Sequence, residues 1–347
     1  MGKQLERILL IRTDRIGDVV LTTPTATMLK SCYPDIHISF LARPYTKPLL
    51  QQHRHIDRIL TYDPQGVHRG LGGHRRLVAQ LREQRFDAAI LFYPRPALAA
   101  AIRLAGIPLR VGNGYRWYSF LLNQRFYEHR KHGDKHELTH NLTFLTPFLD
   151  PEKEAVRFEF ALNGELQHWR EKYTREIGLK AGYVIIHPGN GGSAPNLSVQ
   201  QYRDIARFVL ENSNRQILFT GSAEERQLIE HIAAPLDASR VRHSAGRLNM
   251  SELMAVTAGA ALFIATSTGP LHIANAFGIP VLAFYFPSDP CSPRRWGPYD
   301  QLAWVLTPDV PPCDHCRPAR CPNGNCVEKI SAQRIEDMLA KRLGKLG

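Results

Sequence analysis

The chain lacks any apolar run long enough to cross a bilayer, which predicts a soluble protein rather than an integral membrane protein. Near its start, the only apolar run is Ile8 to Ile11, between two arginines, and it is too short for the central segment of a secretory signal. We therefore expect a cytoplasmic location. Low-complexity tracts and short-period repeats are also missing, so the sequence reads as globular throughout.

Acidic side chains are scarce in the first half. Residues 1–150 hold 22 Lys and Arg against 12 Asp and Glu, which gives +10 of the total net charge of +12. This asymmetry predicts an anionic partner that meets the first half. Nucleic acid, an anionic lipid headgroup and a phosphorylated sugar all satisfy it, and composition does not choose among them.

Cysteine is scarce too, and four of the six cysteines lie in one Pro- and Gly-rich loop: Cys313, Cys316, Cys321 and Cys326. In a cytoplasmic chain this spacing favours a structural zinc or iron held by four thiolates over disulfides. Reduced thiols without a metal are the alternative. Packing accounts for the isolated Cys32 and Cys291.

What the sequence does contain is a repeated alternation of apolar runs and helical patterns. At 347 residues, two domains are the natural division. In the first half, strands are expected at 7–12, 37–42 and 87–93, with helical patterns at 18–30, 72–84 and 96–105. In the second half, strands are expected at 183–187, 216–220 and 261–265, with helices at 198–211, 224–233 and 250–257. This alternation predicts two mostly parallel sheets, with the default ligand site in the cleft between the halves.

One stretch near the end of the second half predicts an anion site. Residues 261–284 read as a buried strand, a Ser-Thr-Gly-Pro turn, a short helix ended by Gly278, and a second buried strand. Thr268 is expected to supply a capping hydroxyl. A helix that starts at the carboxyl end of a parallel strand directs unpaired N–H groups at a ligand, so a phosphate is the expected guest.

Other strand ends carry similar residues. Asp18 follows the first strand, where it is placed as a general base, although helix capping explains an Asp there equally well. Asp14 lies in the same turn, and position alone does not decide between the two acids. The glycines of residues 187–193 suit a diphosphate but lack the lysine of a Walker loop. Glu225 suits ribose hydroxyls, or it forms a capping box with Ser222.

Taken together, these segments resemble glycosyltransferase family 9, the heptosyltransferases that build the inner core of lipopolysaccharide. The resemblance covers nearly the whole chain and is carried by ILLIRTDRIGDVVLTTP, HPGNGGSAPNLSVQQYRDIA, FTGSAEE, GRLNMSEL and ATSTGPLHIANAFGIPVLAFY. It implies an α/β chain of the GT-B fold, with two facing Rossmann-like doubly wound domains and a cleft between them. It further implies an acceptor on the first domain, an ADP-sugar on the second, inversion at the anomeric carbon, and neither metal nor other cofactor for catalysis.

The resemblance also assigns residues. Asp18 corresponds to the general base, with Arg12, Arg15 and Gly17 beside the acceptor. The donor site would be formed by residues of four loops: His187, Gly189 and Asn190; Gly221, Glu224 and Glu225 for the ribose; Leu248 and Met250 for the adenine; and Ser267, Thr268, Gly269 and His272 for the diphosphate. For His272, packing within its helix is the alternative.

The chain departs from the family pattern at two positions. Ser267 stands where many members have an acidic residue or Asn, and Asn196-Leu197-Ser198 stands where many have a Lys before a Trp. Without that lysine, Arg12, Arg15 or another basic residue of the first domain is expected to neutralise the leaving phosphates.

The expected domains are residues 1–160 for the acceptor, residues 161–328 for the nucleotide sugar with the Cys-rich loop 311–326, and an amphipathic helix in 329–347 that crosses back to the first domain. The expected reaction is transfer of heptose from ADP-heptose to an anionic lipopolysaccharide-core acceptor, with peripheral contact at the inner membrane and no nucleic acid. A heptosyltransferase acting on a protein hydroxyl is one alternative. The other alternative is a basic nucleic-acid-binding protein with a structural metal. The absence of recognised RNA-binding aromatics in a basic stretch counts against it.

Overall fold

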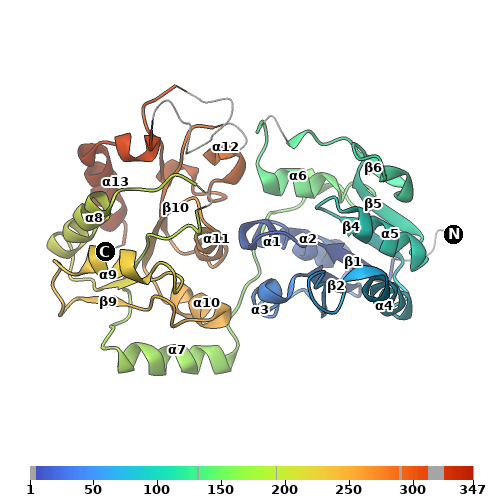
Figure 1. Cartoon of the computed structure of the whole chain (residues 1–347), viewed down its shortest axis with the longest axis horizontal. Coiled ribbons are helices and arrows are strands. Elements are labelled where there is room, and N and C mark those ends of the chain that lie inside the picture. Colours follow the sequence, from blue (N-terminus) through green and yellow to red (C-terminus); the bar gives the residue numbers. More distant parts are fainter. Residues whose placement is uncertain (1–4, 131–132, 193, 289–290, 312–323, 347) are drawn as a thin grey trace. The chain divides into compact units, whose positions relative to one another are not determined.

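The computed structural model describes residues 5–130, 133–192, 194–288, 291–311 and 324–346, and it divides into two compact units (Figure 1). Unit 1 comprises Met1–Arg130 and Glu137–Ala161, and unit 2 comprises Lys131–His136 and Leu162–Gly347. Apart from the short segment 131–136, the division falls next to the boundary expected at residue 160. Among the described residues, no helix combines the length and apolar content that a membrane crossing requires.

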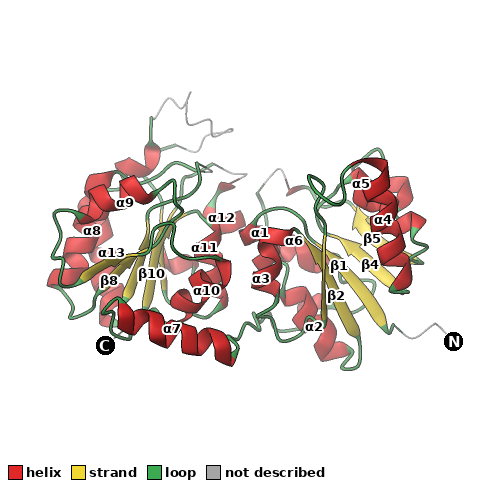
Figure 2. Cartoon of the chain, turned by 60° about the horizontal axis from the view of Figure 1, so that its bottom comes forward, coloured by secondary structure: helices red, strands yellow, loops and turns green. Residues whose placement is uncertain are grey.

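Unit 1 is a six-stranded sheet covered by helices on both faces (Figure 2). Its elements are β1 (Arg7–Ile11), α1 (Ile16–Val20), α2 (Pro24–Cys32), β2 (His37–Ala42), η1 (Pro44–Thr46), α3 (Lys47–Leu50), β3 (Arg58–Thr61), α4 (Gly70–Glu83), β4 (Ala88–Leu91), α5 (Pro96–Leu104), β5 (Leu109–Asn113), η2 (Ser119–Leu121), β6 (Gln124–Phe126), α6 (Glu137–Thr143) and η4 (Pro151–Lys153). The strands are parallel, in the order β3-β2-β1-β4-β5-β6.

Unit 2 repeats this topology. Its elements are α7 (Gly164–Glu176), β7 (Val184–His187), α8 (Val199–Glu211), β8 (Ile217–Phe219), α9 (Arg226–Ala233), β9 (Val241–His243), α10 (Met250–Ala258), β10 (Leu262–Thr266), α11 (Gly269–Ala276), β11 (Val281–Phe284), α12 (Pro293–Trp296), η6 (Leu302–Trp304), β12 (Val305–Leu306), η8 (Cys326–Lys329) and α13 (Ala332–Gly344). Its parallel order, β12-β11-β10-β7-β8-β9, is that of unit 1 read from the other edge.

This strand order places a ligand site in each unit. The order reverses direction between β1 and β4 in unit 1 and between β7 and β10 in unit 2. Doubly wound sheets bind ligands at the carboxyl ends of the strands at such a point, because the helices leave it on opposite faces. The loops after β1 and β10, which carry Asp18 and Thr268, therefore lie where each unit is built to bind. The predicted fold class is confirmed as two Rossmann-like doubly wound units.

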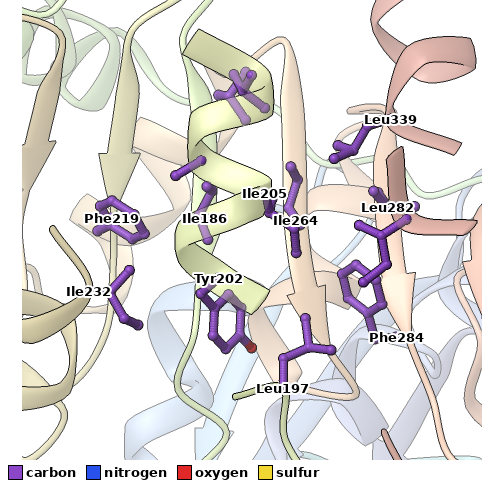
Figure 3. Close-up of a cluster of buried hydrophobic side chains, with 14 of the residues drawn as sticks. Ile186, Leu197, Tyr202, Ile205, Phe219, Ile232, Ile264, Leu282, Phe284 and Leu339 are labelled. Carbon is purple, nitrogen blue, oxygen red and sulfur yellow. The ribbon is translucent and has the colours of Figure 1, made fainter. Parts of the chain in front are cut away.

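The core of unit 2 shows why its sheet is rigid. On one face, Tyr202 and Ile205 of α8 are buried over Ile186 of β7 and Ile264 of β10 (Figure 3). Helix α8 is fixed at its start by a capping box, in which Ser198 caps the helix and Gln201 bonds back to it. On the other face, α7 packs with α10, and α10 packs with α11.

Two expectations about helices need correction. The single helix expected over 18–30 is two helices, α1 and α2, because Pro24 has no N–H for a continuous helix and instead occupies the first position of α2. The terminal amphipathic helix exists as α13, but it does not leave unit 2 for the first domain as expected. It packs against α8, and its Ile335 and Leu339 belong to the core of unit 2.

Candidate functional site

The centre of the site in unit 1 is the side chain of Arg12, which directly follows β1 and is buried. Its Nε donates to Asp14 (2.7 Å), its Nη1 donates to Glu137 (3.1 Å) and to the Asn141 Oδ1 (3.1 Å), and its Nη2 donates to Glu137 (3.1 Å) and to Asp18. These five bonds occupy all five N–H groups of the guanidinium. Arg12 therefore has no donor left for an acceptor or a leaving phosphate. The two roles expected for Arg12, binding the acceptor and neutralising the leaving phosphates, are therefore corrected. Its role is to hold the carboxylates.

Asp18 lies in α1 with its carboxylate paired to Arg12 rather than to the N–H groups at the start of the helix. Burial raises the pKa of Asp18 to about 7; Arg12 opposes the rise, and the charges of Asp14 and Glu137 add to it. The pKa of Arg12 is lowered by burial, but the three carboxylates outweigh burial and raise it above its ordinary value. A carboxyl group that titrates near neutral pH is suited to take a proton from a substrate hydroxyl.

The like charges of this cluster add to the effect of burial, which is the larger cause of the raised pKa of Asp18. A second arginine, Arg130, lies 3.4 Å from the Glu137 carboxylate. With all groups ionised, two arginines face three carboxylates, and the cluster carries one excess negative charge. Protonation of one carboxyl group removes that excess. Asp14 and Asp18 both keep some solvent exposure, whereas Glu137 is fully buried.

Helix α6 holds this cluster in place and was missed by the sequence analysis. Glu137 and Asn141 are four residues apart and therefore share one face of the helix. Asn141 Nδ2 donates to the Leu21 carbonyl (3.1 Å) and to the Thr22 hydroxyl (3.1 Å), and that hydroxyl donates to the Asp18 carbonyl (2.7 Å). The available signal was a Glu and an Asn at helical spacing next to two leucines that are also four residues apart, Leu138 and Leu142. Of the other two residues expected beside the acceptor, Arg15 is exposed to solvent and Gly17 is buried.

In unit 2, His187 ends β7 and is buried, with its Nδ1 2.8 Å from the hydroxyl of Thr220. Burial lowers the pKa of His187 to about 4, although the charge of Glu225 opposes this. The imidazole is therefore neutral at physiological pH. It joins the ends of β7 and β8 and contributes no positive charge to a phosphate.

The loops after β7 and β8 are held together by Glu225. Its carboxylate accepts hydrogen bonds from the N–H of Ser222 (2.8 Å) and from the N–H of Gly191 (3.2 Å). A Cβ atom on Gly189 would lie 2.0 Å from Glu225 Oε2, so a larger residue there would displace the Glu225 carboxylate from these hydrogen bonds. Helix α9 begins at Arg226 with Glu225 as its N-cap residue, so the capping box expected between Ser222 and Glu225 is not formed. Glu225 thus has a structural role, and its remaining lone pairs are those left for ribose hydroxyls.

The other expected donor residues of these loops occupy varied environments. Asn190 folds its own loop, since its Nδ2 donates to the Ala194 carbonyl (2.9 Å) and its Oδ1 accepts from the Gly192 N–H (3.0 Å). Glu224 is exposed, and Gly221 packs closely against Ile229 of α9. On the next loop, Leu248 and Met250 are half-buried, with Met250 as the first residue of α10.

The turn after β10 has the geometry of an anion site. Thr268 occupies the N-cap position of α11, but its hydroxyl makes no capping hydrogen bond, so the expected cap is corrected. Pro270 has no N–H, and the N–H groups of Gly269 and Leu271 come too early in the helix to find an intrahelical acceptor. They are therefore free to bind an anion together with the Thr268 hydroxyl. The hydroxyl of Ser267 bonds to Tyr285 instead.

His272, in the same helix, is buried, and its Nδ1 has no hydrogen-bond partner in the described part of the chain. Burial, and secondarily the nearby His136, lower the pKa of His272 to about 3. Simple packing leaves this nitrogen unsatisfied, which costs free energy. A ligand that donates or shares a hydrogen bond at this nitrogen would recover it.

Asn196, the position that departs from the family pattern, joins several elements of unit 2. Its Nδ2 donates to the Pro188 carbonyl (2.6 Å), and its Oδ1 accepts from the hydroxyls of Tyr202 (2.7 Å) and Thr266 (3.4 Å). The residue therefore braces the loop after β7 against α8 and β10. Because Arg12 is also committed, exposed Arg15 is the remaining candidate among the named cations for neutralising phosphate.

Three of the four clustered cysteines, Cys313, Cys316 and Cys321, lie outside the described residues. Cys326 is described; it is buried and begins η8. Within the described ranges, no group of His, Cys, Asp or Glu is arranged to hold a metal. The zinc or iron site stays a prediction.

Comparison with known proteins shows which protein family has these loops. Residues 74–327 match the model of glycosyltransferase family 9 (heptosyltransferase). The chain is 30% identical over 308 residues to a putative glycosyltransferase of Haemophilus influenzae, covering 86% of this chain and 87% of that protein. It is 24% identical over 288 residues to lipopolysaccharide heptosyltransferase 3 of Escherichia coli K12, covering 81% and 82%.

Among solved structures, the ADP-heptose LPS heptosyltransferase II of E. coli has the same fold, with a TM-score of 0.78, 18% identity, and coverage of 98% of this chain and 99% of that one. This likeness confirms the GT-B fold class, and the family match favours an enzyme over a nucleic-acid-binding module whose loops are merely structural. The chain belongs to glycosyltransferase family 9.

Proposed function

We propose that this glycosyltransferase moves a heptose from ADP-heptose to a hydroxyl group of the lipopolysaccharide inner core, with inversion at the anomeric carbon and without a catalytic metal. The names of its relatives support the donor and the acceptor. The observation that carries the proposal is the Arg12 cluster, in which the partly exposed carboxyl group of Asp18 has its pKa raised to about 7.

In this proposal, unit 1 activates the acceptor. The ionised Asp18 carboxylate accepts the proton of the acceptor hydroxyl as its oxygen forms a bond to the anomeric carbon. Arg12 keeps the carboxylate in one orientation through the hydrogen bond from its Nη2. Asp14 is bonded to the same guanidinium through Nε, and we assign the base role to Asp18 because burial raises its pKa into the range suited to a general base.

Unit 2 stabilises the leaving group. The bond between the anomeric carbon and the diphosphate oxygen breaks, and negative charge grows on the ADP that leaves. The free N–H groups at the start of α11 and the Thr268 hydroxyl are placed to bind that charge, and such fixed donors stabilise a transition state more than mobile water does.

The direct test is to incubate the protein with ADP-heptose and heptose-deficient lipopolysaccharide while following release of ADP. For Asp18→Asn we expect turnover to fall by about 10² to 10⁴ with binding of ADP unchanged. Asp14→Asn is the comparison variant; because it removes one negative charge of the cluster but keeps the Asp18 carboxylate, its turnover should fall only a few-fold. Full turnover in Asp18→Asn would remove Asp18 from the base role, and turnover that is lost on addition of EDTA would contradict the metal-free mechanism.

A further inference from the structure

Unit 1 exposes an unusual number of large apolar side chains in one short stretch. Nine such side chains are exposed among the described residues, and five of them lie between residues 104 and 127. Trp117 is 80% exposed and Phe120 is 67% exposed. Tyr115, Tyr127 and Leu104 are exposed as well. Scattered apolar residues need no explanation, but a concentration of this kind marks an interaction surface.

Tyr115, Trp117 and Phe120 are carried by the connection from β5 to β6, residues 114–123, which we call the crossover; Tyr127 directly follows β6, and Leu104 ends α5. Because β5 and β6 are parallel, the chain must return across a face of the sheet before β6 begins. Tyr118 and Leu122 of the crossover are buried in the core against that face. Trp117 and Phe120 lie on the solvent side. The buried Tyr118 and Leu122 hold the backbone segment that carries them.

The frame is further fixed by hydrogen bonds. The hydroxyl of Ser119 donates to the Asn113 carbonyl (2.9 Å) and accepts from the N–H of Arg116 (3.1 Å). Arg110 Nε donates to the Leu121 carbonyl (2.8 Å). Helix α5, which ends at Leu104, contacts η2 of the crossover. The exposed rings are therefore presented by an ordered surface rather than by a loose loop.

The charge around these rings has one sign. Between Ala88 and Tyr127 the chain has five arginines and neither Asp nor Glu. Arg116 and Arg125 are exposed, and neither forms an ion pair in the described part of the chain. The next acidic residue, Glu128, is engaged by His140 at 2.6 Å. The surface is thus apolar and cationic together.

This combination fits an anionic lipid bilayer. Tryptophan and tyrosine favour the headgroup region of a membrane, and arginines beside them are attracted by anionic lipids. Interfacial binding strengthens with the apolar area that is buried in the membrane and with electrostatic attraction to anionic lipids, and both contributions are present here. Single-stranded nucleic acid also stacks on aromatic rings. The exposed Leu104 at the end of α5 offers no ring for a base to stack on, whereas a membrane accepts aromatic and aliphatic side chains alike.

We propose that the crossover and its flanking arginines, Arg116 and Arg125, form a docking surface for an anionic lipid bilayer. The sequence predicted peripheral membrane contact without assigning it to particular residues. The structure assigns such a site to this face of unit 1, because it separates the exposed Trp117 and Phe120 from the buried Tyr118 and Leu122. The inference concerns membrane binding alone and stands or falls independently of the reaction.

The test uses the full-length protein and large vesicles of phosphatidylcholine, with or without phosphatidylglycerol, in a sedimentation assay. Binding should require phosphatidylglycerol and weaken with added salt. We expect Arg116→Glu/Arg125→Glu and Trp117→Ser/Phe120→Ser each to weaken binding by about tenfold or more. The control variant Leu71→Ser/Arg75→Glu removes one exposed apolar residue and one exposed arginine from α4 of the same unit and should bind as the wild type does.

A second readout locates the contact. Lipids brominated in their acyl chains should quench tryptophan fluorescence in the wild type, and Trp117→Phe should remove most of that quenching while leaving sedimentation nearly intact. Absence of vesicle binding, or equal loss in the Leu71→Ser/Arg75→Glu control, would overturn the proposal. So would a Trp117-dependent dimer, or Trp117-dependent binding to an oligonucleotide without binding to vesicles. Thermal melting of each variant checks that it is folded.

Discussion

Glu137 offers a sharp prediction, because it sets the charge of the Arg12 cluster without any proposed contact to substrate. It accepts hydrogen bonds from both Nη atoms of Arg12, at 3.1 Å each. In Glu137→Gln the amide oxygen can keep a bond to the guanidinium, but one negative charge is lost. Two arginines then face two carboxylates, and the excess that favours a protonated Asp18 is gone. The pKa of Asp18 should therefore fall.

The size of the fall follows from Coulomb's law. A unit charge several ångströms away contributes about 2 kcal/mol at an effective dielectric of about 20, which corresponds to roughly one and a half pKa units. Solvent around the partly exposed carboxylate of Asp18 reduces this, so we expect a fall of about one unit. A less basic carboxylate is also a weaker proton acceptor, and the maximal rate should drop a few-fold.

The assay is kcat/KM for ADP release as a function of pH. In the wild type the acid limb should have a midpoint near the Asp18 pKa of about 7. In Glu137→Gln the limb should move about one unit toward acid, so that the variant keeps a larger fraction of its maximal rate at low pH. Glu128→Gln is the matched control, since it removes a carboxylate that pairs with His140 rather than with Arg12. An acid limb that stays in place in Glu137→Gln, or moves in Glu128→Gln, would refute the reasoning.

Three further predictions concern stability and loop geometry. Because the pKa of Asp18 is raised in the folded state, the native protein binds more protons than the unfolded chain, and the free energy of unfolding should fall as pH rises from about 4 to about 7, by up to about 1.4 kcal/mol per unit from this group. Urea unfolding of Asp18→Asn should show a shallower slope, and an unchanged slope would contradict the assigned pKa. Ser198→Ala should lower the free energy of unfolding by about 1 kcal/mol, whereas Thr268→Ala, which loses no capping bond, should leave it nearly unchanged and weaken ADP binding, as measured by calorimetry. Asn196→Ala should lower the free energy of unfolding by about 2 kcal/mol, because its buried hydrogen-bond partners lose their bonds, and should raise the KM for the donor. An unfolding free energy and a KM equal to those of the wild type would show that this brace is dispensable.

The sequence predicted the central strands well, because β1, β7 and β10 are buried on both faces and read as short apolar runs. It missed β3, β5, β6, β9 and β12, which lie toward the sheet edges, and short half-exposed strands such as Gln124–Phe126 carry no apolar signal. The loops of the candidate site were located because their glycines, hydroxyls and acids follow strands that could be recognised.

The partners of those loops could not be predicted. Glu137 lies 125 residues beyond Arg12 in the chain, and no local pattern links the two. The missing lysine at Asn196 was seen, but that its amide braces three elements required coordinates. Likewise, a cationic side chain such as Arg12 suggests phosphate binding until its five donors are shown to be occupied. Sequence identifies which residues are chemically able to act, whereas tertiary contacts decide which of them are free to do so.

The central claim is that the Asp18 carboxyl group titrates near neutral pH in the folded protein. Carbon-13 NMR of protein labelled at the aspartate carboxyl carbons, recorded across a pH series for the wild type and for Asp18→Asn, measures this directly. We predict one aspartate resonance with a midpoint of about 7 that is absent from the variant. If every aspartate resonance instead shows its midpoint near the ordinary value of about 3.9, the account of the Arg12 cluster is wrong.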